Sequence, residues 1–580
     1  MELQTQTRHT QRRGSARPVV ALAAILSLAA TATIALPRPA LATSGCNTTA
    51  DSTSGDFTVT ATDSTPIKAR IILPVDNAQC SEPTAGWPMV LFMQGSSSTR
   101  CSDMAWITRT QLAQFGYATV SFNGRGFPGG AGADGCGNES AEMADTIDDS
   151  GFDAGGPNDI QDAKDVISHA LSNYDIDTGN IAVLGNSYNG ARTWLLAAAD
   201  TRVTAIVPVA APVRSLIGSL DDISNKSLAE PSSGLLDAYF HASAGFYGNA
   251  DPSVAESLLS AVRSSYLGET LPTATRTWFE DRTILDDNAT LDIVGDTTIP
   301  TFIVNGFLDD RIDPSTAVEA WQALPSGDRY LYLGACGHNA PCATNNASTL
   351  RGKVHDFLDK YLQGSSVSLG GPIFFAVPPA NQASDSWTLQ TASSWPPPQV
   401  AGSPLTFYLR SGGALNTTAP STSEAADTIS NPVWENSLVD LCAGTTYGTG
   451  EHKSYTTTVG AALDLKLVET SVNLYLSSST TRLQVVADLF EVNASTGIET
   501  RVWRGVAHNV PTSRSQTAGT HVQFQFRPSG AGYTVKQGNK LRLKIASNIR
   551  GQYAPEPLPG TYSIYHTNTE PSSVTFTFAS

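Results

Sequence analysis

Short, continuously apolar segments recur through the first 365 residues and alternate with helix-type patterns. These segments lie at residues 88–93, 118–122, 181–184, 203–209, 301–304 and 330–333. Runs of this kind are typical of parallel strands that are buried on both faces of a sheet. Apolar residues also recur with helical spacing at residues 158–171, 191–199 and 354–362. Strands that alternate with helices predict an α/β fold, in which helices cover both faces of a parallel sheet.

Two parts of the chain depart from this alternation. Residues 215–296 contain a capped helical pattern, which we interpret as a helical cap insertion over the ligand-binding end of the sheet. After Gly364, short alternating segments are separated by Gly, Asn, Ser and Pro, which predicts an antiparallel β-sandwich. A chain of 580 residues is long enough for several domains. We therefore expect an α/β domain at 43–365 and a β-sandwich domain at 366–580.

The first 42 residues have the features of a secretory signal peptide. Four arginines precede an apolar run at residues 19–36, and Ala40-Leu41-Ala42 supplies a small-x-small cleavage site. The sequence thus predicts cleavage near Ala42 and a secreted or periplasmic location. An uncleaved membrane anchor and lipidation at Cys46 are the alternatives. No later segment has the unbroken apolar length that a membrane span needs.

Charge and cysteine usage narrow the range of partners. Acidic residues outnumber basic ones by 53 to 36, giving a formal net charge of −17, which disfavours binding to nucleic acid or to an anionic membrane surface. None of the seven cysteines forms a Cys-x-x-Cys pair, so we expect no zinc site. Disulfides persist in an oxidising compartment. We expect the pairs Cys101–Cys136 and Cys336–Cys342, because each flanks loops near the candidate site.

One motif points to chemistry. Residues 181–190 read Ile-Ala-Val-Leu-Gly-Asn-Ser-Tyr-Asn-Gly, which is Gly-x-Ser-x-Gly between a buried strand and a helix. In this context the motif predicts a nucleophile elbow, a tight turn that lifts the Ser187 hydroxyl above the sheet. The backbone N–H of Tyr188, at the start of the helix, would then stabilise an oxyanion. The alternative is a glycine-rich strand–helix turn without a catalytic role.

A serine hydroxyl needs a base before it becomes a good nucleophile. Of the nine histidines, only His338 lies directly after the last predicted parallel strand, in a loop of small residues. Asp309 follows the strand before it; Asp310 and Asp313 compete for the same role, and the spacing from Gly306 favours Asp309. The order Ser187, Asp309, His338 is that of α/β-hydrolases. We therefore predict a catalytic triad of these three residues.

A second oxyanion donor is expected in the loop after residues 88–93. That loop reads Gln94-Gly95-Ser96-Ser97-Ser98, and the backbone N–H of Ser96 is the candidate donor. A flexible serine-rich loop without this role is the alternative. The predicted chemistry is acyl transfer through a covalent acyl-enzyme, which needs neither a metal ion nor an organic cofactor.

These motifs resemble the serine hydrolase family that includes X-Pro dipeptidyl-peptidases, cocaine esterase and α-amino-acid ester hydrolases. The likeness covers most of the chain after the signal. It rests on Asn123-Gly124-Arg125-Gly126, the Gly-x-Ser-Tyr-x-Gly motif followed by Trp194, Trp278-Phe279-Glu280-Asp281-Arg282, Gly306-Phe307-Leu308-Asp309, Gly337-His338, Trp395-Pro396-Pro397 and residues 538–543. The resemblance implies an α/β-hydrolase domain with a helical cap, followed by a jelly-roll, galactose-binding-like C-terminal domain. One departure is that this loop after the third strand offers only serines, where family members often supply a Tyr hydroxyl to the oxyanion hole.

The resemblance, together with the signal, implies an exported serine hydrolase. The first expectation is a dipeptidyl-peptidase of X-Pro type that releases N-terminal dipeptides, with a small molecule or peptide as its partner. Such an exopeptidase must bind a free amine, best with carboxylates, and we assign none. The alternatives are a carboxylesterase or amidase of the cocaine-esterase type, and a non-catalytic protein whose sandwich binds carbohydrate or a surface.

Overall fold

The computed structural model describes most of the chain after the predicted signal. Its described residues are 46, 52–78, 80–93, 95, 99–125, 156–213, 284, 293–307, 309, 312, 314–325, 327–334, 337–338, 344–377, 388–395, 397, 404–432, 447–461, 463–464, 469–481, 483–508, 517–526, 534–549 and 558–577. The predicted signal peptide (1–42) lies outside them, as does nearly all of the predicted cap insertion (215–296).

The first sheet has ten strands in the order β1-β2-β4-β3-β5-β6-β7-β8-β9-β10. Neighbours from β4 through β9 pair in parallel, whereas β1–β2, β2–β4 and β9–β10 are antiparallel. The strands are β1 (Ser52–Thr60), β2 (Pro66–Pro74), β3 (Trp87–Met93), β4 (Ala118–Phe122), β5 (Ile176–Asn186), β6 (Val203–Val209), β7 (Thr301–Gly306), β8 (Arg329–Gly334), β9 (Ile373–Val377) and β10 (Thr388–Ala392). The six apolar segments identified in the sequence correspond to β3–β8, which confirms the parallel sheet.

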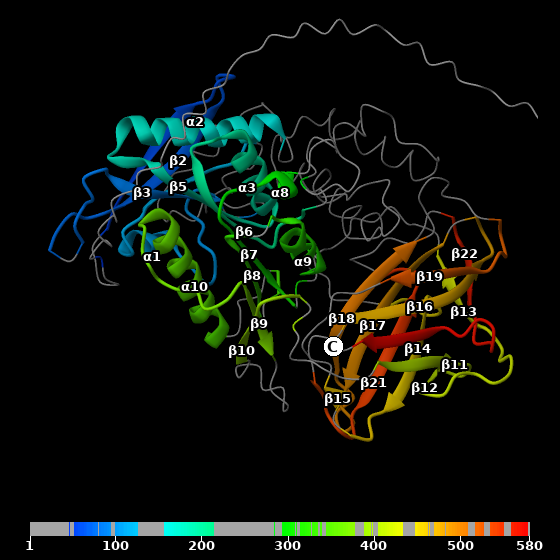
Figure 1. Cartoon of the computed structure of the whole chain (residues 1–580). Coiled ribbons are helices and arrows are strands. Elements are labelled where there is room, and N and C mark those ends of the chain that lie inside the picture. Colours follow the sequence, from blue (N-terminus) through cyan, green and yellow to red (C-terminus); the bar gives the residue numbers. More distant parts are fainter. Residues whose placement is uncertain are drawn as a thin grey trace, which may run out of the picture. The chain divides into compact units, whose positions relative to one another are not determined.

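Helices cover both faces of this sheet, as Figure 1 shows. They are α1 (Arg109–Gln114), α2 (Pro157–Asn173), α3 (Tyr188–Ala199), α8 (Ile293–Asp296), α9 (Pro314–Ala323) and α10 (Thr344–Leu362). Side chains from α2, α3, α8 and α9 share one hydrophobic cluster with one face of the strands. Side chains from α1 and α10 share a second cluster with the other face. Alternate residues of each central strand enter the two clusters, because successive strand side chains point to opposite faces.

The first sheet continues beyond the point where the sequence changes character. We expected the α/β domain to end at residue 365, but β9 pairs with β8 in parallel and β10 pairs with β9. The sheet therefore extends to Ala392. The apolar segment Ile373–Val377 is fully buried, since β9 lies between two other strands. This segment was assigned from its sequence to the all-strand region, and the expected boundary at residue 365 therefore precedes the end of the first sheet.

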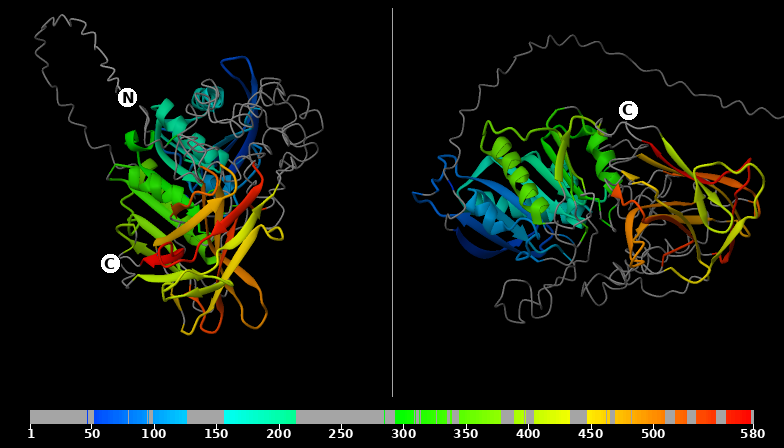
Figure 2. Two further views of the ribbon diagram at one scale, coloured as in Figure 1. Left: turned by 90° about the vertical axis from the view of Figure 1, so that its right-hand side faces the viewer. Right: turned by 90° about the horizontal axis from the view of Figure 1, so that it is seen from below.

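The remainder of the chain forms a second, eleven-stranded sheet (Figures 1 and 2). Its pairs are antiparallel except β12–β14. The strands are β11 (Leu405–Arg410), β12 (Ala414–Asn416), β13 (Asp427–Asn431), β14 (His452–Thr458), β16 (Glu469–Ser478), β17 (Gln484–Val492), β18 (Glu499–His508), β19 (Val522–Phe526), β21 (Lys540–Ala546), β22 (Gly560–Ile564) and β23 (Ser573–Thr577), with β15 (Leu463–Asp464) and β20 (Thr534–Val535) as a separate pair. One hydrophobic cluster draws on nearly all of them, so the sheet encloses its own core, as a sandwich does.

The described cysteines are disulfide-bonded. Cys46 pairs with Cys80 across 34 residues of sequence, a pair that the sequence did not single out. Cys101 is also disulfide-bonded, while Cys136, Cys336, Cys342 and Cys442 lie outside the described residues. The expected pairs Cys101–Cys136 and Cys336–Cys342 stay predictions.

Candidate active site

Ser187 occupies a sharp turn between β5 and α3. Its backbone has φ 56° and ψ −121°, a positive φ that is costly for a residue with a side chain. Two backbone hydrogen bonds hold this conformation: the Ser187 N–H donates to the Val209 carbonyl at 2.8 Å, and the Gly190 N–H donates to the Ser187 carbonyl at 2.8 Å. The turn therefore has the strained geometry of a nucleophile elbow.

The two motif glycines are required by close backbone approach. A Cβ on Gly185 would lie 2.2 Å from the Asn189 carbonyl oxygen and 2.2 Å from Thr193 Oγ1. A Cβ on Gly190 would lie 2.7 Å from the carbonyl oxygen of Val209. Neither position has room for a methyl group, so the spacing Gly-x-Ser-x-Gly follows from how β5, α3 and β6 pack around the turn.

Three side chains from three separate strand ends meet at this turn. Ser187 Oγ lies 2.8 Å from His338 Nε2, and His338 Nδ1 lies 2.9 Å from Asp309 Oδ2. Ser187 follows β5, Asp309 follows β7 and His338 follows β8, so all three stand at the carboxyl edge of the sheet. The side chains of His338 and Asp309 are 5% and 1% exposed, which removes water from between the ring and the carboxylate.

Asp309 is held in turn by its own loop. Its Oδ1 accepts a hydrogen bond from the Ile312 N–H at 2.9 Å, and its N–H donates to the Gly306 carbonyl at 3.1 Å. The carboxylate therefore faces His338 with one oxygen while the other is fixed to the backbone. The competing acids Asp310 and Asp313 lie outside the described residues.

The loop after β3 passes directly beside the nucleophile. A Cβ on Gly95 would lie 3.2 Å from Ser187 Cβ, so the backbone at Gly95 is in close contact with the elbow. Ser96, the expected second oxyanion donor, lies outside the described residues, as do Ser97 and Ser98. Its role stays a prediction.

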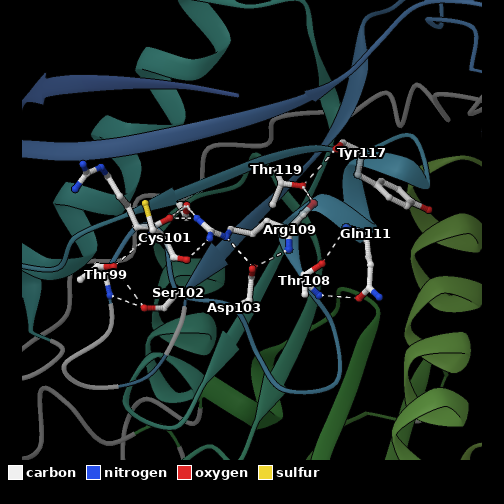
Figure 3. Close-up of polar contacts among 11 residues, drawn as sticks. Thr99, Cys101, Ser102, Asp103, Thr108, Arg109, Gln111, Tyr117 and Thr119 are labelled. Atoms are coloured by element: carbon white, nitrogen blue, oxygen red, sulfur yellow. Dashed lines mark hydrogen bonds and ion pairs between the residues drawn. The ribbon is translucent and has the colours of Figure 1, made fainter. Parts of the chain in front are cut away.

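The far end of the same loop is anchored by a buried arginine. Figure 3 shows Arg109, the first residue of α1, among the polar groups of the segment that starts at Thr99. Its guanidinium donates to the carbonyl oxygens of Arg100 and Cys101, to Asp103 Oδ1 at 2.9 Å and to Ser121 Oγ at 3.1 Å. Sequence reasoning missed this arginine, because two of its four partners are backbone carbonyls and none of the four belongs to a recognisable motif.

A second set of buried polar groups lies behind the elbow. Tyr188 OH donates to Asp159 Oδ2 at 2.6 Å, and Arg192 Nη2 lies 3.2 Å from Asp159 Oδ1. Arg192 Nη1 also donates to Asn189 Oδ1 at 2.7 Å. Asp159 and Arg192 are 0% and 1% exposed. Only a backbone role was predicted for Tyr188, so its side-chain contacts and those of Asp159 and Arg192 are findings of the structure.

A neighbouring ion pair extends this buried network. Arg125 donates to both oxygens of Asp162, at 2.8 Å and 2.6 Å, and to Asp63 Oδ2 at 2.8 Å. Burial raises the pKa of Asp162 to about 6, and the hydrogen bonds from Arg125 oppose this rise. The hydrogen bond from Arg125 lowers the pKa of the more exposed Asp63 to about 2. Arg125 belongs to a segment that resembles a family motif, but its ion pairs with Asp162 and Asp63 were not predicted from the sequence.

The described residues hold neither a metal-binding cluster nor a membrane-spanning helix. Within this part of the chain, no group of three or more His, Cys, Asp or Glu side chains could hold a metal ion. No helix in the same part combines the length and the apolar character needed to cross a bilayer.

Comparison with known proteins identifies the family. The family model of the X-Pro dipeptidyl-peptidase (S15 family) matches residues 63–340, and that of the X-Pro dipeptidyl-peptidase C-terminal non-catalytic domain matches residues 377–577. No functionally curated protein matches the sequence.

Solved structures share the fold over nearly the whole chain. A CocE/NonD family hydrolase from Staphylococcus aureus has a TM-score of 0.63 at 13% identity, covering 90% of this chain and 93% of its own. An aminopeptidase from a marine sediment Thaumarchaeota archaeon has 0.62 at 13% identity, with 92% and 97% covered. An α-amino acid ester hydrolase has 0.60 at 14% identity, with 95% and 100% covered. The two family-model matches together span most of the sequence, so the chain belongs to the X-Pro dipeptidyl-peptidase (S15) family of hydrolases.

Proposed function

We propose that the chain is an exported serine hydrolase that cleaves acyl bonds through a covalent acyl-enzyme. The observation that carries this proposal is the unbroken pair of hydrogen bonds from Ser187 to His338 and from His338 to Asp309. A nucleophile, a base and a group that orients the base are the minimum for activating a serine hydroxyl.

In the proposed reaction, Ser187 Oγ attacks the substrate carbonyl while His338 Nε2 accepts the hydroxyl proton. The neutral ring must then carry its own proton on Nδ1, and the 2.9 Å contact with the Asp309 carboxylate favours that tautomer. His338 returns the proton to the leaving group, which departs and leaves an acyl-enzyme. Water then attacks the ester carbonyl, with His338 again as base.

The negative charge that develops on the carbonyl oxygen needs hydrogen-bond donors that are already in place. We assign this role to the backbone N–H of Tyr188, at the first residue of α3, and to the backbone N–H of Ser96. The close approach of Gly95 to Ser187 supports the second assignment, because it brings the loop after β3 to the nucleophile.

As substrate class we propose peptides from which N-terminal X-Pro dipeptides are released. The match to the X-Pro dipeptidyl-peptidase models over both parts of the chain supports this choice. An ester or amide substrate of the cocaine-esterase type is the second candidate, and the likeness to a CocE/NonD hydrolase and an α-amino acid ester hydrolase favours it.

Covalent labelling tests the hydrolase proposal without a known substrate. We expect a fluorophosphonate probe to label the wild-type protein, and the Ser187→Ala variant to lose the label. Ser168→Ala is the control and keeps the label, because this exposed helix position is outside the triad and its hydroxyl contacts only the Lys164 carbonyl and the Arg202 guanidinium among the described residues. A folded wild-type protein that takes no label would overturn the proposal in favour of a non-catalytic binding protein.

Paired substrates test the peptide assignment. A dipeptidyl-peptidase recognises the free amine of its substrate, so hydrolysis of an Ala-Pro anilide should fall steeply when its amine is acetylated. Equal rates on the free and acetylated anilide would exclude the dipeptidyl-peptidase and leave the esterase or amidase.

Export is a separate part of the proposal and has its own test. N-terminal sequencing of protein collected outside the cytoplasm should start at Thr43, directly after the cleavage site at Ala42. A mature protein that still begins at Met1 would contradict this part alone.

A further inference from the structure

The residue that follows the nucleophile is fixed by its side chain as well as by its backbone. We propose that Asp159 and Arg192 are positioning residues for the proposed hydrolysis: through Tyr188 they hold the oxyanion-binding N–H in place. The inference rests on the proposed function, since it concerns the rate at which Ser187 reacts.

The contacts constrain Tyr188 from two sides. Its hydroxyl donates to Asp159 Oδ2 at 2.6 Å, and the Arg192 guanidinium lies 5.4 Å from the centre of its ring. The Tyr188 residue is 2% exposed. A hydrogen bond at the tip and a cation over the face together restrict both the translation and the tilt of the ring.

Arg192 also contacts Asn189, the second residue after the nucleophile, and so connects it to Asp159. Its Nη1 donates to Asn189 Oδ1 at 2.7 Å, and its Nη2 donates to the backbone carbonyl of Asp159 at 2.9 Å. The side chains of Tyr188 and Asn189 therefore both bond to one buried ion pair, which consists of Asp159 from α2 and Arg192 from α3. The pair links the start of α2 to the start of α3.

The contacts of Tyr188 affect the reactivity of Ser187 because the strained backbone is at Ser187 itself, one residue before Tyr188. The positive φ at Ser187 persists only if the structure on each side holds the turn. On the amino side, Ser187 N–H is bonded to the Val209 carbonyl. On the carboxyl side, the anchored ring of Tyr188 fixes the peptide whose N–H must meet the oxyanion. A small displacement of that N–H lowers the rate, since oxyanion stabilisation depends on a donor that is already in position.

The chain supplies a matched control for the tyrosine. Tyr117, which is also fully buried, donates its hydroxyl to the carboxylate of Asp359 on α10. Removing either hydroxyl deletes one tyrosine–aspartate hydrogen bond, which is part-buried at Tyr117, where the Asp359 side chain is 23% exposed, and buried at Tyr188. Only Tyr188 adjoins the nucleophile, so a purely structural role would make the two variants behave alike.

The experiment compares Tyr188→Phe, Asp159→Asn, the double variant and Tyr117→Phe with wild type. The readouts are the second-order rate constant of fluorophosphonate inactivation and the thermal midpoint. We expect Tyr188→Phe to react about tenfold more slowly, and Tyr117→Phe to react at the wild-type rate with a similar loss of thermal stability. The double variant should be no slower than its slower parent, because both substitutions break one link.

The outcomes separate this inference from the proposed function. Should wild type react with the probe while Tyr188→Phe reacts within twofold of it, the positioning role is wrong and the hydrolase proposal stands. Should wild type itself fail to react, the proposed function is wrong and the inference falls with it. If Asp159→Asn does not fold, the isosteric Tyr188→Phe variant and its control still decide.

Discussion

The Arg125–Asp162 ion pair allows a quantitative test of the buried network. Arg125 is 4% exposed and Asp162 is 0% exposed, and their two hydrogen bonds are 2.8 Å and 2.6 Å long. In an Arg125→Met variant, the carboxyl of Asp162 stays buried without its guanidinium. Removing one partner of a buried pair destabilises a protein by about 3–5 kcal/mol, because the other charge is left uncompensated.

The same variant should depend on pH in a defined direction. Burial raises the pKa of Asp162 to about 6 even beside Arg125, and the pKa must rise further once Arg125 is removed. The folded-state pKa then lies above the unfolded value of about 3.9. Stability from such a group is fully present below the unfolded pKa and is lost as pH rises through the folded pKa. The deficit of the variant should therefore be larger at pH 8 than at pH 5, by roughly 1.4 kcal/mol for each unit of added pKa shift.

Thermal unfolding of variant and wild type at pH 5 and pH 8, at one ionic strength, measures this difference. Arg70→Met is the control, since the Arg70–Asp56 pair has similar geometry but side chains that are 21% and 34% exposed. Its loss should stay below about 1 kcal/mol at both pH values. The reasoning would be refuted if Arg125→Met cost no more than Arg70→Met, or if its deficit did not change between the two pH values.

Three further outcomes are expected. Gly95→Ala, whose Cβ would lie 3.2 Å from Ser187 Cβ, should slow fluorophosphonate labelling while the thermal midpoint changes little; unchanged labelling would contradict the contact. Gly185→Ala should destabilise the protein by about 3 kcal/mol through backbone overlap, whereas Gly352→Ala on α10, with nothing within 4 Å of the added methyl, should be neutral or stabilising by up to about 1 kcal/mol. Removing the Cys46–Cys80 disulfide by a serine at each position should lower stability by about 3 kcal/mol, and a reductant should then leave the melting of these variants less affected than that of wild type.

The parallel sheet and the elbow could be predicted because local sequence dictates them. A strand buried on both faces has to be apolar throughout, and the six apolar runs became β3–β8. A turn with no space for a Cβ at two positions needs glycine at both, so the spacing of Gly185 and Gly190 around Ser187 indicates this turn. Chain order along the parallel sheet was enough to bring Asp309 and His338 to the same edge as Ser187.

The domain boundary and the buried charges could not be read in this way. The strand Ile373–Val377 is apolar like the earlier strands, but it follows the last helix and comes before an exposed antiparallel strand. Only its pairing with β8, more than thirty residues earlier, assigns it to the first sheet. Periodicity reports what one segment buries, and says nothing of which distant strand lies beside it.

The start of α2 illustrates why side-chain networks escape a sequence reading. Acidic residues in the first turn of a helix are ordinarily explained by the helix dipole, and Asp159 fits that pattern. The structure gives Asp159 and Asp162 a different reason, since each is fully buried against an arginine outside its own helix, Arg192 and Arg125. A charge is stable in a core only with its partner in place, so neither half of such a pair is interpretable alone. The pair of Asp159 and Arg192 also contacts the side chains of the two residues that follow Ser187. The Gly-x-Ser-x-Gly motif predicts the strained turn, but the turn is also held by two charged residues that lie outside the motif.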